Sequence, residues 1–325
     1  MHMHDPNFPP DLSIQPSVSS SSPSKDILAF NQDVDIKQYG IAGRIWEAAY
    51  TLAVYITPPP LCPTDSTVSK SGSSPVLEFD PPSSLFYDHI RSTTVVEVGS
   101  GTGYAGIHVA RQLGSFYRRE NTHATDTSVI LTDLENVVPL LEKGIQEHRH
   151  LTGASIRLEA HALEWGNPVH ADQLARRLKA LRKNVTHVLC SDLVYFPHLY
   201  PPLLKTLLTL TSPPFCDPSF GPEVIIGYRV RSLTKEIPFW QVFGTWFSFA
   251  PVLTRHLGTE EAKTAWGRFG TANDTHVFVA SRRPESYMWS VPTENSQLMN
   301  GFGPSPPRLD DTFESLLLLG IDTDD

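Results

Sequence analysis

The amino-acid sequence predicts an α/β protein in which helices cover a mostly parallel β-sheet. From about residue 85 onward, short β-rich runs alternate with amphipathic segments of helical length, and this alternation is typical of a parallel sheet. Four glycines follow the first such run closely, in the stretch VVEVGSGTGYAG at residues 95–106. The chain has 325 residues, of which 40% are hydrophobic, so it can bury a sizeable core.

The regular elements can be placed in order along the chain. The expected strands are β-rich runs at residues 93–99, 128–133, 155–160, 185–192, 223–229 and 275–281. The expected helices fall between them, at residues 104–113, 134–148, 171–182, 200–210 and 234–247. The run FWQVFGTWFSF at 239–249 has aromatic residues at helical spacing. This pattern predicts core packing, with an acceptor groove on one face as the alternative.

Three segments are expected to lie outside this regular pattern. Residues 1–28 form a Ser/Pro-rich tail that buries too little apolar surface to offset its ordering entropy and is expected to be disordered. Residues 57–82 are interpreted as a Pro/Ser-rich loop insertion, because the segment before them is too short to fold alone. Residues 284–325 form an acidic, irregular tail with four consecutive leucines. We expect that this tail folds back on the preceding domain (residues 29–283), stays loose, or serves as a docking peptide for a partner.

Charge and cysteine content exclude several classes of protein. The formal net charge of −9 argues against a nucleic-acid-binding surface and leaves room for a basic partner. Cys62, Cys190 and Cys216 have no paired spacing, so neither a disulfide framework nor a metal site is expected. No apolar run approaches the roughly 20 residues of a membrane span. We therefore expect a cytoplasmic protein with no membrane contact, with the nucleus as the alternative location.

The glycine-rich stretch can be interpreted in two registers. From Gly101 it is GTGYAG, a pattern that holds the pyrophosphate of a dinucleotide over a helix N-terminus. From Glu97 it is EVGSGTG, an acid inside the strand followed by Gly99, Gly101 and Gly103. A dinucleotide site also needs an acid about 20 residues further on, and Asp133 ends the next strand but lies beyond that spacing.

Glu97 favours the second register. An ionised carboxylate would repel a pyrophosphate, whereas the ammonium and sulfonium groups of S-adenosylmethionine attract it. We therefore expect S-adenosylmethionine as the cofactor, with Asp133 bonding its ribose hydroxyls. Two alternatives remain, a buried structural acid at Glu97 and a turn that binds no ligand.

Three stretches carry a resemblance to a known family. They are EVGSGTGYAGI at the glycine loop, SDLVYFPHLYPPLLKTLLTL with Asp192 and Tyr195, and GRIWEAAYTLAVYI with Trp46. Together they resemble methyltransferase family 16, the seven-β-strand protein-lysine methyltransferases with an Asp-x-x-Tyr signature. The resemblance spans about residues 36–281. The glycine loop alone is typical of the whole superfamily, and the DLVY stretch is far more specific.

The resemblance implies a Rossmann-like, seven-stranded class I methyltransferase sheet, mostly parallel with an antiparallel last strand and helices on both faces. It implies S-adenosylmethionine as the donor and a lysine of a non-histone protein as the acceptor, with translation elongation factors and chaperones as the suggested targets. By the same resemblance, Trp165 in LEWG packs beside the adenine, Trp46 forms a wall of the donor pocket, and Ser191 contacts the donor. Residues 29–283 would form this methyltransferase domain.

The chemistry assigns different tasks to Asp192 and Tyr195. A lysine with a pKa near 10.4 is neutral in only about one molecule in 2,500 at pH 7, and a carboxylate beside it opposes deprotonation. Asp192 is therefore expected to capture and orient the amine, while water or desolvation completes deprotonation. Tyr195 is expected to be a wall or hydrogen-bond partner. The structural alternative is that Asp192 caps the next segment and Tyr195 packs in the core.

Other residues and other functions remain open at this stage. Arg229 and Arg231 follow an expected strand and are either solvated charges or contacts for an acidic target surface. The competing functions are a small-molecule methyltransferase, a non-catalytic S-adenosylmethionine-binding scaffold and an NAD-dependent oxidoreductase.

Overall fold

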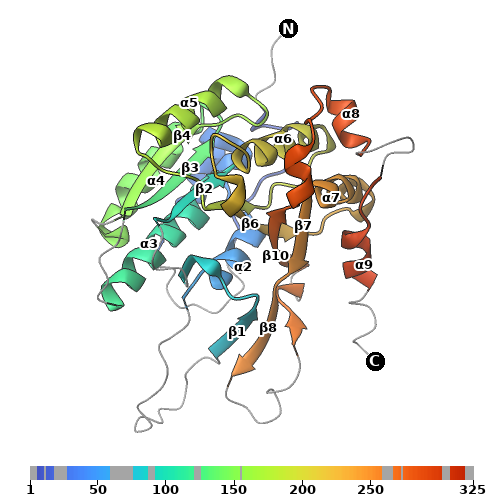
Figure 1. Ribbon diagram of the computed structural model, residues 1–325. Helices are drawn as coiled ribbons and strands as arrows, with labels where there is room; N and C mark the ends of the chain where they lie inside the picture. The colour runs from blue at the N-terminus through green and yellow to red at the C-terminus, as the bar shows by residue number, and fades with distance from the viewer. Residues whose placement is uncertain are drawn as a thin grey trace.

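A seven-stranded β-sheet forms the centre of the protein (Figure 1). The structure is a computed structural model that describes residues 6–10, 12–17, 28–58, 76–86, 92–120, 126–153, 156–257, 266–271, 274–301 and 308–318. The strand order across the sheet is β4-β3-β2-β5-β6-β10-β7. These strands are β2 (Thr94–Val98), β3 (Thr127–Asp133), β4 (Ile156–Ala162), β5 (His187–Ser191), β6 (Glu223–Arg229), β7 (Phe247–Pro251) and β10 (Thr275–Arg282).

Strand direction agrees with the expectation from the sequence. Strands β4, β3, β2, β5 and β6 pair in parallel, whereas β10 lies antiparallel to both β6 and β7. The expectation of a mostly parallel sheet with a reversed last strand is therefore confirmed. The order of strands reverses at β2, which has β3 on one side and β5 on the other. Ligands of open α/β sheets bind at such a switch point, at the carboxyl ends of the strands.

Helices cover both faces of this sheet, because alternate strand residues point to opposite sides. Val95, Leu189 and Ile225 pack into a core beneath helices α2 (Glu47–Tyr55), α3 (Tyr104–Arg119) and α4 (Val138–Thr152). Their strand neighbours Val96 and Val188 pack into a second core beneath α5 (Pro168–Ala180), α6 (Tyr200–Leu210) and α7 (Leu233–Trp246). Helix α1 spans Gln32–Tyr39. In the described part of the chain, no helix combines the length and apolarity needed to cross a membrane.

The edge strand β7 begins within the aromatic run at 239–249. Helix α7 ends at Trp246, one residue before the expected end of the helix, and β7 begins at Phe247. Phe243 and Phe247 are both fully buried, and their rings stack with centroids 4.6 Å apart. The expectation of core packing is confirmed. The change from helix to strand was not predicted, since large aromatic residues suit a buried face of either element.

A small second sheet corrects the prediction that residues 57–82 are entirely loop. Strand β1 (Val76–Asp80) pairs antiparallel with β8 (Leu253–Leu257), which in turn pairs with β9 (Gly267–Arg268). The Phe79 ring packs 4.9 Å from that of Phe269. Local sequence could not reveal a strand whose partner lies so far along the chain. Residues 59–75 of the predicted insertion lie outside the described part.

The C-terminal segment also differs from the irregular tail that was predicted. It contains helices α8 (Asn295–Met299) and α9 (Thr312–Leu318). Phe313 of α9 is fully buried, and its ring stacks on that of Trp240 at 4.9 Å. Asp310, just before α9, accepts a hydrogen bond of 3.0 Å from Arg283. The described part of the tail thus folds back on the domain, which is one of the three alternatives expected from the sequence.

Candidate active site

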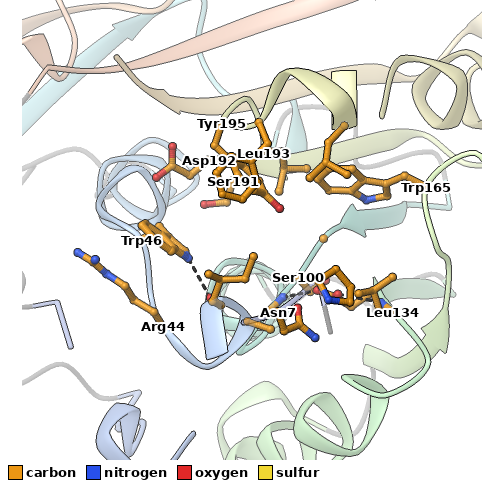
Figure 2. A pocket seen from close by; sticks show the side chains of 18 of the residues that line it. Asn7, Arg44, Trp46, Ser100, Leu134, Trp165, Ser191, Asp192, Leu193 and Tyr195 are labelled. Atoms are coloured by element: carbon orange, nitrogen blue, oxygen red, sulfur yellow. Dashed lines mark hydrogen bonds between the residues drawn. The ribbon is translucent and has the colours of Figure 1, made fainter. Parts of the chain in front are cut away.

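One cavity of about 620 Å³ lies at the carboxyl ends of β2, β3, β4 and β5 (Figure 2). Its volume is in the range of pockets that bind small molecules and cofactors. The structure brings nine of the ten site residues expected from the sequence to its wall: Trp46, Glu97, Gly99, Gly101, Asp133, Trp165, Ser191, Asp192 and Tyr195. The tenth, Gly103, is not part of the wall. Residues from four strand ends that are far apart in sequence therefore meet in one place.

The glycine loop between β2 and α3 shapes the floor of this cavity. Gly99 has a φ of +59°, and a Cβ there would lie 2.9 Å from side-chain atoms of Trp165 and Leu193. Gly101 also has a positive φ, and its N–H donates a hydrogen bond of 2.7 Å to Asp133 Oδ2. Gly103 has a different task, since it is the N-cap residue of α3 and has a φ of +77°. The loop follows the backbone path that its glycines permit.

Two carboxyl groups, the buried Glu97 and the partly buried Asp133, give the cavity its electrostatic character. Glu97 is 1% exposed, and its Oε2 accepts a hydrogen bond of 3.2 Å from the N–H of Gly106. Burial raises the pKa of the Glu97 carboxyl to about 8. Burial also raises the pKa of Asp133 to about 6, although N–H groups of Gly101 and Leu134 donate to its carboxyl. Glu97 therefore keeps its proton near neutral pH, and a positively charged ligand would favour the ionised forms of both groups.

Asp192 is held by Arg229, the last residue of the adjacent strand β6, and by Arg231, which follows that strand. It adopts a φ of +62° directly after β5, and its side chain is fully buried. Its Oδ1 accepts a hydrogen bond of 2.7 Å from Arg231 Nη1, while Arg231 Nη2 donates to Oδ2. The N–H of Arg229 also donates to Oδ1, at 3.3 Å. The carboxylate thus pairs across to β6 rather than capping the segment that follows it, contrary to the structural alternative weighed from the sequence.

Arg231 is a site residue that the sequence analysis did not identify. It was weighed as a solvated charge or a contact for an acidic target, but its side chain is only 29% exposed and lines the cavity. Its guanidinium carbon also lies 5.4 Å from the centre of the Trp46 ring, over which Arg44 lies at 4.4 Å. The available signal was its position two residues after β6, because β6 neighbours β5, the strand that Asp192 directly follows.

Tyr195 lies on the cavity wall rather than in the closed core. Its ring meets that of Trp165 edge-on, with centroids 6.4 Å apart. Burial raises the pKa of its hydroxyl, and the nearby carboxylates of Asp133 and Asp192 raise it further. The hydroxyl therefore stays protonated near neutral pH. It can form a wall or donate a hydrogen bond, but it is a poor proton acceptor.

The N-terminal segment forms part of the wall, which corrects the prediction that residues 1–28 are disordered. The residues from this segment that line the cavity are Pro6, Asn7, Phe8, Pro9, Pro10 and Leu12. Asn7 is 4% exposed, and its carbonyl accepts a hydrogen bond of 2.9 Å from the N–H of Ile41. Composition favoured disorder because it does not register a contact between segments so far apart. The remaining residues of this tail, apart from 12–17 and 28, lie outside the described part.

The family of the protein follows from comparison with known proteins. The model of a family described as lysine methyltransferase matches residues 23–241, more than half of the chain. The chain belongs to this lysine methyltransferase family. Its matched region contains the glycine loop, Asp133, Trp165 and the Asp192-to-Tyr195 stretch that meet in the cavity. The resemblance noted in the sequence is thereby confirmed.

Three protein-lysine methyltransferases are among the proteins that this chain resembles. It is 33% identical over 153 residues to the protein-lysine N-methyltransferase EFM6 of Saccharomyces cerevisiae, covering 44% of this chain and 56% of that protein. It is 25% identical over 180 residues to the protein N-lysine methyltransferase METTL21A of Xenopus tropicalis, covering 55% and 59%. It is 29% identical over 128 residues to the protein-lysine N-methyltransferase rrg1 of Schizosaccharomyces pombe, covering 39% and 37%.

The alignments cover between 37% and 59% of the length of each relative, which is less than two thirds. Membership of the lysine methyltransferase family agrees with the residues in the cavity, since two acids and aromatic walls suit a cationic, adenine-containing methyl donor. Within the described residues, no three His, Cys, Asp or Glu side chains are grouped as metal ligands.

Proposed function

We propose that this protein is an S-adenosylmethionine-dependent protein-lysine N-methyltransferase. One observation carries the proposal: a single cavity contains both the donor loop after β2 and the Asp192-to-Tyr195 stretch after the neighbouring strand β5. Methyl transfer from a sulfonium to an amine is an in-line displacement, so donor and acceptor sites must adjoin. Membership of the lysine methyltransferase family supports the same reaction.

The donor half of the cavity fits S-adenosylmethionine. The buried Glu97 and the partly buried Asp133 are the acids that would face its charged and ribose groups, while Trp46 and Trp165 offer apolar faces. When bound, S-adenosylmethionine supplies an electrophilic methyl group on a positively charged sulfur. The protein's contribution is to hold this group at a fixed position and to exclude water from it. The close fit of Gly99 against Trp165 leaves no room for a side chain there.

The acceptor half contains an ion pair between Asp192 and Arg231. Removing one partner of a buried ion pair costs about 3–5 kcal/mol, so we infer that a lysine amine binds beside the pair and does not displace the arginine. The carboxylate oxygens can still accept an N–H hydrogen bond from the amine. Because the arginine compensates the carboxylate charge, the pair stabilises an ammonium less than a lone carboxylate would. This resolves the difficulty that Asp192 alone would oppose deprotonation.

The target that we propose is a lysine of a non-histone protein, in the cytoplasm or the nucleus. Translation elongation factors and chaperones are the target types that the family resemblance suggests. The formal net charge of −9 suits a basic target surface. The proposal does not extend to nucleic-acid or membrane partners. Nor does it extend to docking through the C-terminal tail, because Phe313 of α9 is buried in the domain's own core.

The proposal is tested by methyl transfer to proteins in an extract. Purified protein is incubated with methyl-labelled S-adenosylmethionine and a eukaryotic cytosolic extract, and labelled proteins are resolved by size. We expect a discrete labelled band whose modified residue is lysine. Asp192→Asn should abolish this label while calorimetry still detects donor binding. Asp310→Asn is the matched control, because Asp310 also pairs with an arginine but lies outside the cavity.

Other outcomes would support the competing functions. Label in low-molecular-weight material would indicate a small-molecule acceptor. Tight donor binding without transfer to any extract would indicate a non-catalytic scaffold. Binding of NAD instead of S-adenosylmethionine would favour an oxidoreductase. Equal labelling by the wild type and the Asp192→Asn variant would remove Asp192 from the mechanism.

A further inference from the structure

The N-terminal segment is attached to the rest of the protein at two points, Asn7 and Ser17. At the first point, the carbonyl of Asn7 accepts the N–H of Ile41 at 2.9 Å. The preceding residue, Gly40, has a φ of +56°, and a Cβ at this position would lie 1.8 Å from the Asn7 oxygen. Any residue other than glycine would therefore push the segment away. The absence of a side chain at Gly40 thus leaves room for the N-terminal segment.

The second point of attachment lies at Ser17. Its N–H donates to Gln32 Oε1 at 3.2 Å, and Gln32 Nε2 donates back to the Ser17 carbonyl at 3.0 Å. The same Oε1 accepts the N–H of Ile45 at 3.0 Å. Both attachment points therefore lie on the stretch that leads to Trp46, itself part of the cavity wall. A segment held at both ends has lost most of its conformational freedom, so it can serve as a wall at little further entropic cost.

Four of the residues between these points line the cavity: Phe8, Pro9, Pro10 and Leu12. Phe8 and Leu12 line it and are 40% and 41% exposed, so a molecule in the cavity would contact apolar side chains that otherwise meet water. Figure 2 shows Asn7 near Ser100 and Leu134, across the cavity from Ser191 and Tyr195. Pro6 also borders a shallower depression with Leu134. The segment thus lies on the side of Leu134, the residue that directly follows β3.

We propose that residues 6–10 and 12 are part of the methyl-donor site, and that their contacts with bound S-adenosylmethionine strengthen its binding and slow its dissociation. This inference rests on the proposed function, because it concerns the donor of that reaction. The apolar side chains Phe8 and Leu12 supply the contact area, and the fit of Asn7 against Gly40 fixes the position of the segment.

The test measures donor binding to the full-length chain by calorimetry and donor dissociation by stopped flow. The double variant Phe8→Ala/Leu12→Ala should bind S-adenosylmethionine about tenfold more weakly, the effect expected for losing contact with one buried apolar side chain. Dissociation should become faster by a similar factor. The matched control is Phe220→Ala/Leu309→Ala, since these side chains are 61% and 48% exposed and lie outside the cavity.

A second variant tests the position of the segment separately. Gly40→Ala should weaken donor binding to a similar extent, and adding it to Phe8→Ala/Leu12→Ala should weaken binding little further. Gly153→Ala is its control: Gly153 also has a positive φ, +83°, but a Cβ there would meet only the end of the flexible Arg118 side chain. Any general effect of the substitution on stability should appear in both glycine variants, whereas the loss of donor binding should appear only in Gly40→Ala.

The outcomes separate this inference from the proposed function. If the wild type binds S-adenosylmethionine and Phe8→Ala/Leu12→Ala binds it with unchanged affinity and dissociation rate, the segment is not part of the donor site. If the wild type does not bind S-adenosylmethionine, the proposed function fails and this inference fails with it. Weaker binding in Phe8→Ala/Leu12→Ala and Gly40→Ala, but in neither control, supports the inference.

Discussion

Replacing Glu97 by glutamine should stabilise the ligand-free protein increasingly as pH rises. Burial raises the pKa of this carboxyl from 4.5 to about 8. Between these two values the folded protein keeps a proton that the unfolded chain has released, so the contribution of Glu97 to stability falls as pH rises. Glutamine does not titrate, and its carbonyl oxygen can still accept the N–H of Gly106, which Glu97 Oε2 accepts at 3.2 Å. The variant should therefore escape this loss.

The size of the effect follows from the pKa difference. Each pH unit between the two pKa values corresponds to about 1.36 kcal/mol, and pH 7 lies about 2.5 units above the ordinary value of 4.5. The free energy of unfolding of Glu97→Gln relative to wild type should thus rise by about 3 kcal/mol between pH 4.5 and pH 7. This stability difference should level off above about pH 8, where the Glu97 carboxyl of the folded wild-type protein also ionises.

The assay is urea unfolding of both proteins without ligand at pH 5, 6, 7 and 8. A stability difference that stays constant over this range would refute the reasoning. The matched control is Glu159→Gln: the hydrogen bond from Arg177 lowers the pKa of Glu159 to about 2. The stability due to Glu159 is present above pH 4.5 and is lost only as pH falls through about 2, so its variant should show no pH dependence between pH 5 and 8.

Glu97→Gln should also lower the affinity of the protein for S-adenosylmethionine. Ionised Glu97 attracts a cationic donor, so wild-type affinity for S-adenosylmethionine should increase as pH rises toward about 8. Glu97→Gln should bind the donor more weakly and lose this pH dependence in calorimetric titrations. Affinity and pH dependence equal to those of the wild type would show that Glu97 does not face the donor's charge. The buried acid would then be a structural residue, as one of the sequence alternatives held.

Three further substitutions give distinct expected results. Gly106→Ala should lower the free energy of unfolding by about 1–3 kcal/mol in urea, because its Cβ would lie 2.6 Å from Glu97 Oε2; unchanged stability would mean that the interior can expand there. Phe313→Ala should cost about 3–5 kcal/mol, since this ring is fully buried against Trp240; a loss below about 1 kcal/mol would place α9 outside the core. Arg231→Gln should still bind the donor, but the pH at which its rate of methyl transfer increases should be higher than in the wild type. The rate is measured on the substrate protein that is labelled in the extract. An unchanged pH profile of methyl transfer would contradict the proposed role of Arg231 in deprotonation.

Much of the central fold could be predicted from sequence because its signals are local. Each predicted strand between residues 93 and 281 lies within about two residues of a strand in the structure, since β-rich runs and turn residues mark strands directly. The missed strands depend on distant pairing. Strand β1 pairs with β8, more than 170 residues later in the chain, and β7 continues the aromatic run of α7.

The sequence by itself determined the sheet, the glycine loop and the acids at the strand ends, because period, turn chemistry and motif spacing act over a few residues. Only the tertiary structure decided what those acids meet. Asp192 pairs with Arg231 because β5 and β6 are neighbours in the sheet, and Asn7 reaches Ile41 because Gly40 leaves room for it. Such contacts join segments far apart in the chain. They depend on chain packing as a whole, which no local pattern encodes.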